Sequence, residues 1–422
     1  MKVVNIGIMG MGTVGSGIYK VIESEGKRIE HREDMELRVK RVLALDYSIP
    51  IPESLKTSKI EDLINDDEIT IIAEVMGGIE PAKSFIIKAL QAGKTVVTAN
   101  KELLAKHWPE LELEAKKTGA GLYFEASVGG GIPILRTVSD SMQANSIDTI
   151  FAIINGTTNF ILTKMTDEGR EFADVLAEAQ ALGYAEANPT NDVEAFDAMY
   201  KLSILASMAF HARIPIDQIY REGITKITKE DIGYAKELGY EIKLLAIGKK
   251  TGTTVEVRVH PTMLHKEHPM ASVKGSFNAI FMHGNAVGDV MLYGRGAGDL
   301  PTASAIISDM IYASKVNEHK YATFANTPLA SEKVIFNNNW ETEYFVHIHV
   351  VDRPGVMAKI TKILADYDVS IQSVIQKGRV DAFVPVIIVT HDAKELDMKK
   401  ALAEIEALPD VVKLVNCIRV EK

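Results

Sequence analysis

The chain opens with VVNIGIMGMGTVG (residues 3–15), and this stretch decides the fold of its first part. An apolar run typical of a buried strand leads into the spacing Gly-x-Gly-x-x-Gly, and a helical pattern follows. The three glycines allow a tight turn, close approach of the backbone to a pyrophosphate, and close packing of helix on strand. The first N–H groups of the helix attract phosphate. The stretch therefore predicts a dinucleotide site rather than a plain glycine-rich turn. The residues expected to hold the cofactor are Gly10, Gly12, Thr13, Val14 and Gly15.

Strands and helices alternate from this stretch to about residue 135. Strand-like runs occur at Val3–Met9, Val39–Leu45, Ile69–Val75, Lys94–Thr98 and Leu122–Phe124, with helical patterns such as Glu80–Gln91 and Glu102–Lys117 between them. Alternation of this kind predicts a parallel sheet joined by crossover helices. We therefore expect a Rossmann-type nucleotide-binding domain over residues 1–135 and an α/β protein overall.

Residues 136–301 have the pattern of a mixed α+β domain. Strand-like runs occur at Ile150–Ile154, Thr254–Val259, Phe277–Met282 and Val290–Tyr293, and helical patterns at Phe172–Leu182, Val193–His211 and Lys229–Leu238. A further helix, residues 302–319, is expected to return to the first domain. Residues 320–342 lack periodicity and predict a linker.

The last part, residues 343–422, shows strand, helix, two strands, helix, strand. The segments are Tyr344–Val350, Val356–Tyr367, Val369–Gln376, Phe383–His391, Leu396–Ala407 and Val411–Val420. This βαββαβ order predicts a ferredoxin-like domain.

Composition excludes several classes of protein. The net charge of −10 disfavours a nucleic-acid or anionic-membrane partner, because both select basic surfaces. No apolar run approaches the ~20 residues that a membrane helix needs. The single cysteine allows no internal disulfide and favours a reducing compartment. The chain shows no leader pattern, so we expect a cytoplasmic protein.

Several polar residues follow strands of the first domain, where open α/β sheets bind ligands. Gly77, Thr98 and Lys101 lie at or just after the ends of two neighbouring strands, so they are expected in the crevice that holds the cofactor. Lys101 could instead be a solvated lysine, although a cation at a helix N-terminus is mildly unfavourable. Asp46 ends the second strand and could hold a ribose 2′-OH, or it could be an ordinary strand-end carboxylate.

One helix carries a charged pair among apolar neighbours. Asp197 and Lys201 are four residues apart, and therefore one turn apart on one helix face. On a surface such a pair contributes about 0.3–0.5 kcal/mol. Here the flanking residues are apolar nearly all round, which predicts burial. Burial makes a lysine easier to deprotonate, as an acid/base catalyst requires.

At this point the chain resembles homoserine dehydrogenase. The segments that carry the resemblance occur in the family's order over residues 1 to about 320. They are Gly10–Gly15, MGGIEP (76–81), VTANK (97–101), FEASVGGGIP (124–133), NGTTN (155–159), Gly183–Pro189, Asp197–Lys201, HPT (260–262) and YGRGAGDLPT (293–302). The segment DRPGV (352–356) looks like the start of an ACT domain, and there is no room for a fused aspartate kinase.

The resemblance implies a reaction and its residues. L-Homoserine and L-aspartate 4-semialdehyde would be interconverted by hydride transfer with NAD or NADP, in threonine, methionine and isoleucine biosynthesis. Lys201 would exchange the proton of the C4 oxygen, assisted by Lys101. The acidic residues expected to hold the substrate and orient the lysines are Glu186, Asp192 and Asp197. Residues 136–301 would bind substrate and form the dimer.

The resemblance also implies further ligands. Gly296 would join the cofactor site. A monovalent cation, with sodium as the expected ion, would take oxygen ligands, as hard cations do. The expected ligands are the Glu125 carboxylate and the carbonyl groups of Val128, Gly130 and Ile132. The ACT domain would bind an allosteric effector, L-threonine being the expected one, and the chain would form a homodimer or tetramer.

Two positions depart from the family pattern. Members often have aspartate where this chain has Asn188, and many have arginine where it has Leu45, before Asp46. Without that arginine, we expect NAD to be used at least as well as NADP, although Lys56 and Lys59 could supply the missing cation. The alternatives are a different dehydrogenase of similar plan and a redox-sensing binding module without catalysis.

Overall fold

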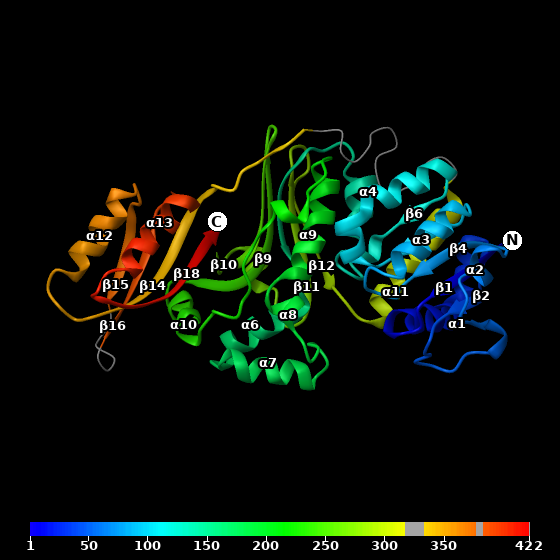
Figure 1. Ribbon diagram of the computed structural model, residues 1–422, viewed down its shortest axis with the longest axis horizontal. Coiled ribbons are helices and arrows are strands. Elements are labelled where there is room, and N and C mark those ends of the chain that lie inside the picture. Colours follow the sequence, from blue (N-terminus) through cyan, green and yellow to red (C-terminus); the bar gives the residue numbers. More distant parts are fainter. Residues whose placement is uncertain (317–332, 377–382, 422) are drawn as a thin grey trace.

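The computed structural model describes residues 1–316, 333–376 and 383–421. Its N-terminal, central and C-terminal parts lie in a row (Figure 1). The end of the expected helix 302–319 and most of the expected linker 320–342 fall within residues 317–332, outside the described residues. No described helix has both the length and the apolar character needed to cross a membrane.

The N-terminal part is built on a six-stranded sheet in which all neighbouring strands are parallel. In order across the sheet, the strands are β3 (Lys56–Thr57), β2 (Met35–Leu43), β1 (Lys2–Met9), β4 (Ile69–Glu74), β5 (Thr95–Thr98) and β6 (Leu122–Tyr123). Its helices are α1 (Thr13–Glu33), α2 (Glu61–Ile64), α3 (Ala82–Gln91) and α4 (Lys101–Thr118). The predicted parallel sheet is confirmed. β2 begins earlier than expected, because Met35 and Leu37 alternate with polar neighbours instead of forming a continuous apolar run.

A helix from later in the chain completes this part. α11 (Asp299–Lys315) lies against α1 (Figure 1) and begins three residues before the helix expected over 302–319. A Cβ atom on Gly17 would stand 2.5 Å from the Asp299 carbonyl oxygen, so only glycine allows this approach. Ile18 and Ile306 share one buried core.

The central and C-terminal parts share one twelve-stranded sheet. The central strands run in the order β12 (Gly288–Arg295), β11 (Phe277–Gly284), β7 (Ile147–Ile153), β9 (Tyr240–Thr251) and β10 (Thr254–His265), with β8 (Tyr220–Arg221) and β13 (Ile335–Phe336) beside β10. The central helices are α5 (Ile134–Arg136), α6 (Gly156–Glu168), α7 (Phe172–Ala181), α8 (Thr190–Val193), α9 (Phe196–Ala209) and α10 (Lys229–Glu237). Sequence reasoning did not anticipate β9 or α6, whose polar residues interrupt the expected periodicity.

The C-terminal part has the predicted βαββαβ order, with an additional two-residue strand before its second helix. Its elements are β14 (Glu341–Val350), α12 (Val356–Asp366), β15 (Ile371–Gln376), β16 (Val384–Thr390), β17 (Ala393–Lys394), α13 (Glu395–Glu406) and β18 (Val411–Glu421). The strand order is β18-β14-β16-β15. β18 also pairs in parallel with β10, with Thr262 opposite Arg419. The C-terminal part is therefore joined to the central part by backbone hydrogen bonds.

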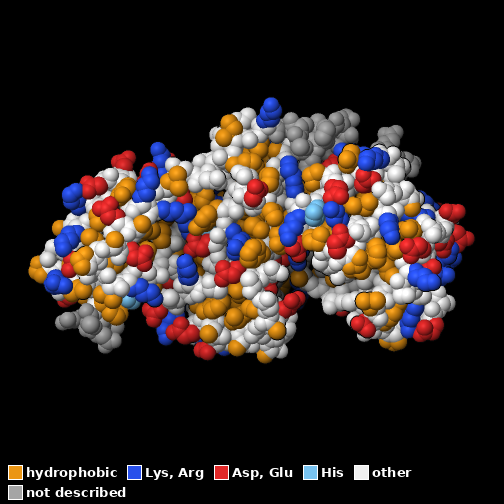
Figure 2. Space-filling view, in the orientation of Figure 1, with side chains coloured by type: hydrophobic (Ala, Val, Ile, Leu, Met, Phe, Trp, Pro, Cys, Tyr) orange, Lys and Arg blue, Asp and Glu red, His pale blue; other side chains and the backbone are white. Residues whose placement is uncertain are grey.

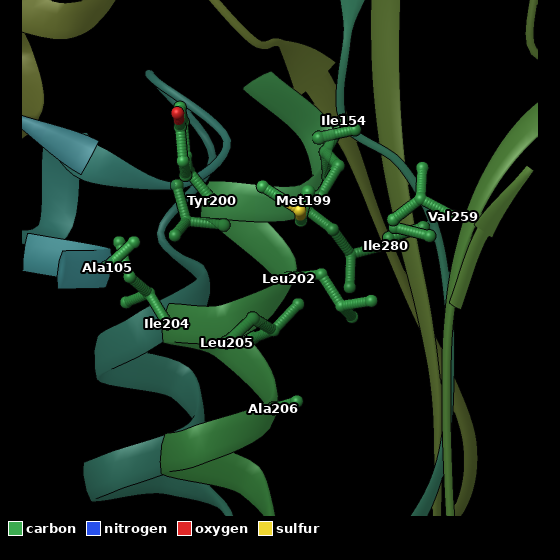
Figure 3. Close-up of a cluster of buried hydrophobic side chains, with 14 of the residues drawn as sticks. Ala105, Ile154, Met199, Tyr200, Leu202, Ile204, Leu205, Ala206, Val259 and Ile280 are labelled. Atoms are coloured by element: carbon green, nitrogen blue, oxygen red, sulfur yellow. The ribbon is translucent and has the colours of Figure 1, made fainter. Parts of the chain in front are cut away.

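The buried helix α9 lies at the centre of the molecule. Figure 3 shows Leu202 on the side facing Val259 and Ile280 of the sheet, and Ile204 on the opposite side near Ala105 of α4. Every residue of α9 from Asp197 to Ala209 is buried. The helix expected over Val193–His211 begins only at Phe196, because Ala195 adopts a left-handed conformation with φ of 63° and separates α9 from the short helix α8.

Candidate active site and nucleotide site

The glycine loop has the geometry of a dinucleotide site. Gly10 has φ of 104°, a conformation that favours glycine. A Cβ atom on Gly15 would stand 2.1 Å from the Gly10 carbonyl oxygen, so helix and loop pack closely only without a side chain. At Gly12 a Cβ atom would meet no heavy atom within 4 Å. Gly12 also supplies no side-chain cap to α1, so the helix N–H groups that begin at Thr13 are open to a phosphate.

A buried carboxyl group joins the two loops beside this site. Glu74 accepts hydrogen bonds from the Met76 backbone N–H at 2.8 Å and from the Thr98 hydroxyl at 2.6 Å. Burial raises the pKa of Glu74. The next loop is fixed by Asn100, whose side chain donates to the Gly78 carbonyl at 2.7 Å and caps α4. Thr98 is therefore a hydrogen-bonded support of the crevice. Sequence reasoning gave Glu74 no role, although a carboxyl group within the apolar run Ile69–Val75 was a local signal of a buried charge.

The remaining expected cofactor residues have varied surroundings. Gly77 is exposed, with φ of 76°. Asp46 is exposed in the loop after β2, which ends at Leu43 rather than at Asp46. Gly296 is buried, and a Cβ atom on it would collide with the Asn278 side chain at 1.8 Å. Gly296 thus packs against protein in this structure, whereas Gly77 and Asp46 face solvent.

Asp197 is the centre of a buried charged cluster. Its two carboxylate oxygens contact the Lys101 ammonium at 2.9 Å and the Lys201 ammonium at 2.6 Å. Lys101 is the first residue of α4 in the nucleotide-binding part, whereas Asp197 and Lys201 lie on α9. The three charges that the sequence singled out therefore meet where two parts of the chain adjoin.

Two residues that sequence reasoning gave no role complete the cluster. The Lys201 ammonium also donates to the Ile154 carbonyl at 2.8 Å. The Asn155 side-chain amide donates to Asp192 at 2.7 Å and to Asp197 at 2.9 Å. Asn155 follows β7 and caps α6. It begins the NGTTN segment (155–159) of the family resemblance, which was the signal that could have found it.

The cluster separates the pKa values of its two lysines. Burial lowers the pKa of Lys201 below its ordinary value, although Asp197 acts in the opposite direction. The charge of Asp197 raises the pKa of the half-exposed Lys101. Burial opposes ionisation of Asp197, but Lys101 and Lys201 outweigh it and hold its pKa well below the usual range. Burial raises the pKa of Asp192. One lysine is thus biased toward a neutral amine and the other toward a cation.

Glu186 lies at the exposed rim of this cluster. Its negative charge contributes to the raised pKa of Lys101, which places it in the electrostatic field of the site. The Gln180 side chain donates to the Glu186 carbonyl at 3.0 Å and fixes the backbone. The carboxylate is left exposed. Glu186 and the half-buried Asp192 are therefore available to a cationic group that enters from solvent.

Glu125 of the expected cation site is buried and tightly bonded. Its carboxylate oxygens accept the backbone N–H groups of Leu135 at 2.9 Å and Arg136 at 2.7 Å. The neighbouring Asp309 accepts the backbone N–H of Glu125 at 2.9 Å. Burial and the charge of Asp309 raise the pKa of Glu125 to about 7. A cation here would favour the ionised carboxylate.

The carbonyl groups of the same loop differ in how they are bonded. The Ile132 carbonyl accepts the Ile134 N–H at 2.8 Å. Within the described part of the chain, the carbonyl groups of Val128 and Gly130 accept no hydrogen bond. Gly130 has φ of 53°, which turns the loop. These oxygen atoms fit the donor set that a hard cation needs.

Together, the dinucleotide loop and the lysine–aspartate cluster define an oxidoreductase that can pair hydride transfer to a nucleotide with proton transfer at a buried amine. The comparisons with known proteins agree. Residues 133–311 match the family model described as homoserine dehydrogenase, and residues 10–125 match the homoserine dehydrogenase NAD binding domain. Residues 344–410 match the ACT domain.

Whole-length relatives lead to the same result. The chain is 39% identical to homoserine dehydrogenase of Bacillus subtilis, covering 100% of this chain and 99% of that one, and 40% identical to that of Pseudomonas aeruginosa, covering 100% of both. The crystal structure of a homoserine dehydrogenase from Thiobacillus denitrificans matches with a TM-score of 0.93 and 40% identity over 100% of this chain and 99% of that one. The chain belongs to the homoserine dehydrogenase family. It is an NAD(P)-dependent oxidoreductase with a C-terminal ACT domain.

Proposed function

We propose that the Asp197 cluster carries out the proton transfer of homoserine oxidation, with Lys201 as the proton acceptor. The observation that carries this proposal is the buried Lys201 ammonium, held by Asp197 at 2.6 Å and by a backbone carbonyl at 2.8 Å. Burial favours its neutral form, which can take the proton of the C4 hydroxyl group. A bound NAD or NADP would supply the acceptor for the C4 hydride, and the product is L-aspartate 4-semialdehyde. In the reverse direction, protonated Lys201 returns the proton.

Lys101 has a different role in the proposal. Because its pKa is raised, it stays cationic and can polarise the C4 oxygen while Lys201 exchanges the proton. Asp197 orients both lysines. Glu186 and Asp192 hold the ammonium group of homoserine, since they are the acidic residues that the cluster leaves open to solvent. Asn188 is exposed on the same loop, and an amide there gives this rim one carboxylate fewer than many relatives have.

The cofactor is held by the glycine loop and the neighbouring strand ends. The residues proposed to bind it are Gly10, Gly12, Thr13, Val14, Gly15, Asp46, Gly77, Thr98, Lys101 and Gly296. We propose that NAD is used at least as well as NADP, because Leu45 is exposed and uncharged beside exposed Asp46. One relative, an archaeal homoserine dehydrogenase with a TM-score of 0.64 and 29% identity, covering 74% of this chain and 98% of that one, has a structure in complex with NADPH.

We propose that the loop from Glu125 to Ile132 holds a monovalent cation, with sodium as the expected ion. The carbonyl groups of Val128 and Gly130 that lack hydrogen bonds, together with the Glu125 carboxylate, support this. The cation would fix the loop at the boundary between the nucleotide-binding and central parts. Removing sodium and replacing it with a large organic cation should lower activity reversibly.

The C-terminal ACT domain is proposed to regulate the enzyme by binding L-threonine at the turn before α12. There Gly355 has φ of 91° and Asp352–Val356 line a small cavity. Removing the ACT domain by ending the chain near Thr342 would not test this regulation cleanly. It would remove β18, which pairs with β10, and also Ile418 and Val420, which belong to the central core. Millimolar L-threonine should instead inhibit the full-length enzyme, and Gly355→Ala should abolish that inhibition. Indifference to threonine, isoleucine and methionine alike would contradict a regulatory role at this turn.

The proposed organisation follows from these roles. Residues 1–135, together with the returning helix, bind the nucleotide, and residues 136–301 bind the substrate and form the contacts of a homodimer or tetramer. Residues 320–342 are the linker to the ACT domain, and residues 343–422 are the domain that regulates the enzyme. The proposed location is the cytoplasm, where the reaction would serve threonine, methionine and isoleucine synthesis.

The test of the central proposal is homoserine-dependent reduction of NAD or NADP by the purified enzyme. Lys101→Ala should lower turnover severely. Glu186→Ala should mainly raise the KM for homoserine, because it removes a binding contact rather than the proton acceptor. A turnover loss of equal size in Glu186→Ala, with KM unchanged, would contradict the assignment.

A further inference from the structure

A second cavity lies away from the active site, where the ACT domain meets the central part. Its volume of about 650 Å³ falls within the roughly 300–1,000 Å³ of small-molecule sites. It is bounded by α13, by β18 and by residues 222–228, which connect β8 to α10. We call it the junction pocket. Figure 1 shows α13 and β18 on the side of the ACT domain that faces the central part. The turn at Gly355 is elsewhere and lines a separate cavity.

The wall of the junction pocket is a fixed network of charges. Buried Arg419 donates to Glu395 at 2.7 and 3.2 Å, to the Tyr220 hydroxyl at 2.9 Å and also to Glu222. Glu395 in turn accepts the Tyr344 hydroxyl at 2.8 Å. The hydrogen-bonding and charge requirements of these groups are met by one another. They therefore form a rigid wall and need no ligand to balance them.

Other charged groups at the pocket lack partners. Within the described ranges, Lys226, Lys413 and Glu406 make no ion pair or side-chain hydrogen bond. A strand edge is open as well. β18 pairs with β14 on one side, but on the other it meets β10 only from Arg419 onward. Figure 2 shows acidic and basic side chains interspersed over the face of the molecule that it draws.

These groups define the chemistry of a ligand. Two free cations suit a carboxylate, a free carboxylate suits an ammonium group, and the open strand edge offers backbone donors and acceptors. Met398, Leu402 and Leu414 add an apolar surface. A molecule that carries a carboxylate, an ammonium group and a small apolar side chain is an aliphatic α-amino acid.

The pocket is connected to the active site through one short segment. Within the 222–228 connector, the Ile224 N–H donates to the Val193 carbonyl at 2.8 Å and the Thr225 hydroxyl to Glu194 at 3.0 Å. A Cβ atom on Gly223 would stand 2.3 Å from the Val193 carbonyl oxygen, so the two backbones are in direct contact. Val193 follows Asp192 directly. A shift of the connector must therefore move the backbone that carries the acidic residues of the active site.

The ACT domain forms hydrogen bonds with the other side of the same connector. The Asn416 amide of β18 donates to the Lys226 carbonyl at 3.1 Å and to Asp231 at 3.0 Å. Asp231 also bonds to His347 of β14 at 2.8 Å. The connector is thus held between β18 and the Val193 segment, and a ligand against β18 would contact both.

We propose that the junction pocket binds an aliphatic α-amino acid and that the 222–228 connector transmits its occupancy to the Asp192–Asp197 segment. The proposal that an amino acid binds depends only on the residues of the junction pocket. The proposal that its binding affects catalysis rests on the proposed function of the Asp197 cluster. The site is separate from the turn at Gly355, so the enzyme has two places at which an amino acid can act.

Hydrogen–deuterium exchange of the full-length protein tests the proposal. L-Valine and L-isoleucine are added one at a time at millimolar concentration, and peptides covering 222–228, 412–418 and 190–197 are followed. Exchange of all three should slow, by about tenfold near saturation for a coupling of ordinary size. Protection confined to peptides around residues 351–357, or no protection by either amino acid, would overturn the proposal.

Charge-reversal variants provide the matched comparison. The double variant Lys226→Glu with Lys413→Glu changes two exposed side chains and should weaken binding about tenfold or more. The control, Lys362→Glu with Lys400→Glu, makes the same change of net charge on exposed lysines outside the pocket and should bind as the parent does. Equal binding by both variants would overturn the proposal. The readout needs no turnover, so an inactive dehydrogenase would not be mistaken for an empty pocket.

Discussion

Replacing Lys201 with methionine is the most direct test of the active site, because the structure indicates that the protein should still fold. Asp197 would keep Lys101 at 2.9 Å and Asn155 at 2.9 Å, so no buried charge is left without a partner. The buried Ile154 carbonyl loses its hydrogen bond from Lys201, and an unsatisfied buried acceptor costs about 1–3 kcal/mol. Methionine has nearly the shape of the lysine stem and fills the same space. We therefore expect a modest loss of stability that leaves the protein folded.

The loss of activity should be far larger. A positioned acid/base group contributes typically ~10²–10⁴-fold, which corresponds to about 3–5 kcal/mol of activation free energy. We expect kcat for homoserine oxidation to fall by that factor while KM changes little, since the acidic residues proposed to hold the substrate are intact. The assay is the absorbance of reduced nicotinamide at saturating homoserine across the pH range, together with the melting temperature.

A second buried lysine provides the control. Lys243 of β9 is 1% exposed and donates to the Val273 carbonyl at 2.7 Å, much as Lys201 donates to Ile154. Lys243 belongs to no part of the Asp197 cluster. Lys243→Met should therefore retain full turnover. The reasoning is refuted if folded Lys201→Met keeps kcat within about threefold of the parent enzyme at every pH, or if both variants lose activity equally.

Three other expectations follow from the geometry. Gly12→Ala should keep the melting temperature of the parent protein but raise the KM for cofactor, because a methyl group there meets only the open space of the cofactor site. Gly15→Ala should lower the melting temperature, because its methyl group collides with the Gly10 carbonyl. Equal melting temperatures of the two variants would contradict this. Burial lowers the pKa of Lys243 from 10.5 to about 8, so the unfolded chain binds the proton more tightly between these values. The free energy of unfolding should rise through that pH window by up to ~3 kcal/mol, and Lys243→Met should remove this rise in denaturant titrations. Finally, kcat/KM should be at least as high with NAD as with NADP, and Asp46→Ala should shift the ratio of these two kcat/KM values toward NADP. A tenfold preference of the parent enzyme for NADP would refute the role given to Leu45 and Asp46.

Local patterns in the sequence predicted the parts of the site that depend on spacing along the chain. The Gly10–Gly15 loop could be predicted because strand, turn and helix N-terminus are consecutive. The Asp197–Lys201 pair could be predicted because residues four apart share one helix face and their neighbours are apolar. For the same reason, the βαββαβ order of the last part was visible from its elements alone.

Contacts between distant segments could not be predicted in this way. Glu74 lies at the end of an apolar strand like many others, and only the fold places it beside Thr98. Asn155 contacts Asp197 because β7 and α9 adjoin in space. The pairing of β18 with β10 also depends on where two distant strands lie in space. The sequence of each strand is equally compatible with an unpaired position at the edge of a sheet. The left-handed Ala195 carries no sequence signal, because alanine has no preference for that conformation.

The physical reason for joining two lysines to one aspartate lies in their different exposure. Two amines in identical surroundings would titrate together, and neither would be reserved for proton transfer. Here α9 is buried all round and lowers the pKa of Lys201, whereas Lys101 opens a helix at the boundary with solvent and Asp197 raises its pKa. Titratable groups whose surroundings push their pKa values apart can serve as base and as electrostatic support in one reaction. In the proposed mechanism, the position of α9 between α4 and the sheet would therefore determine which lysine takes the proton.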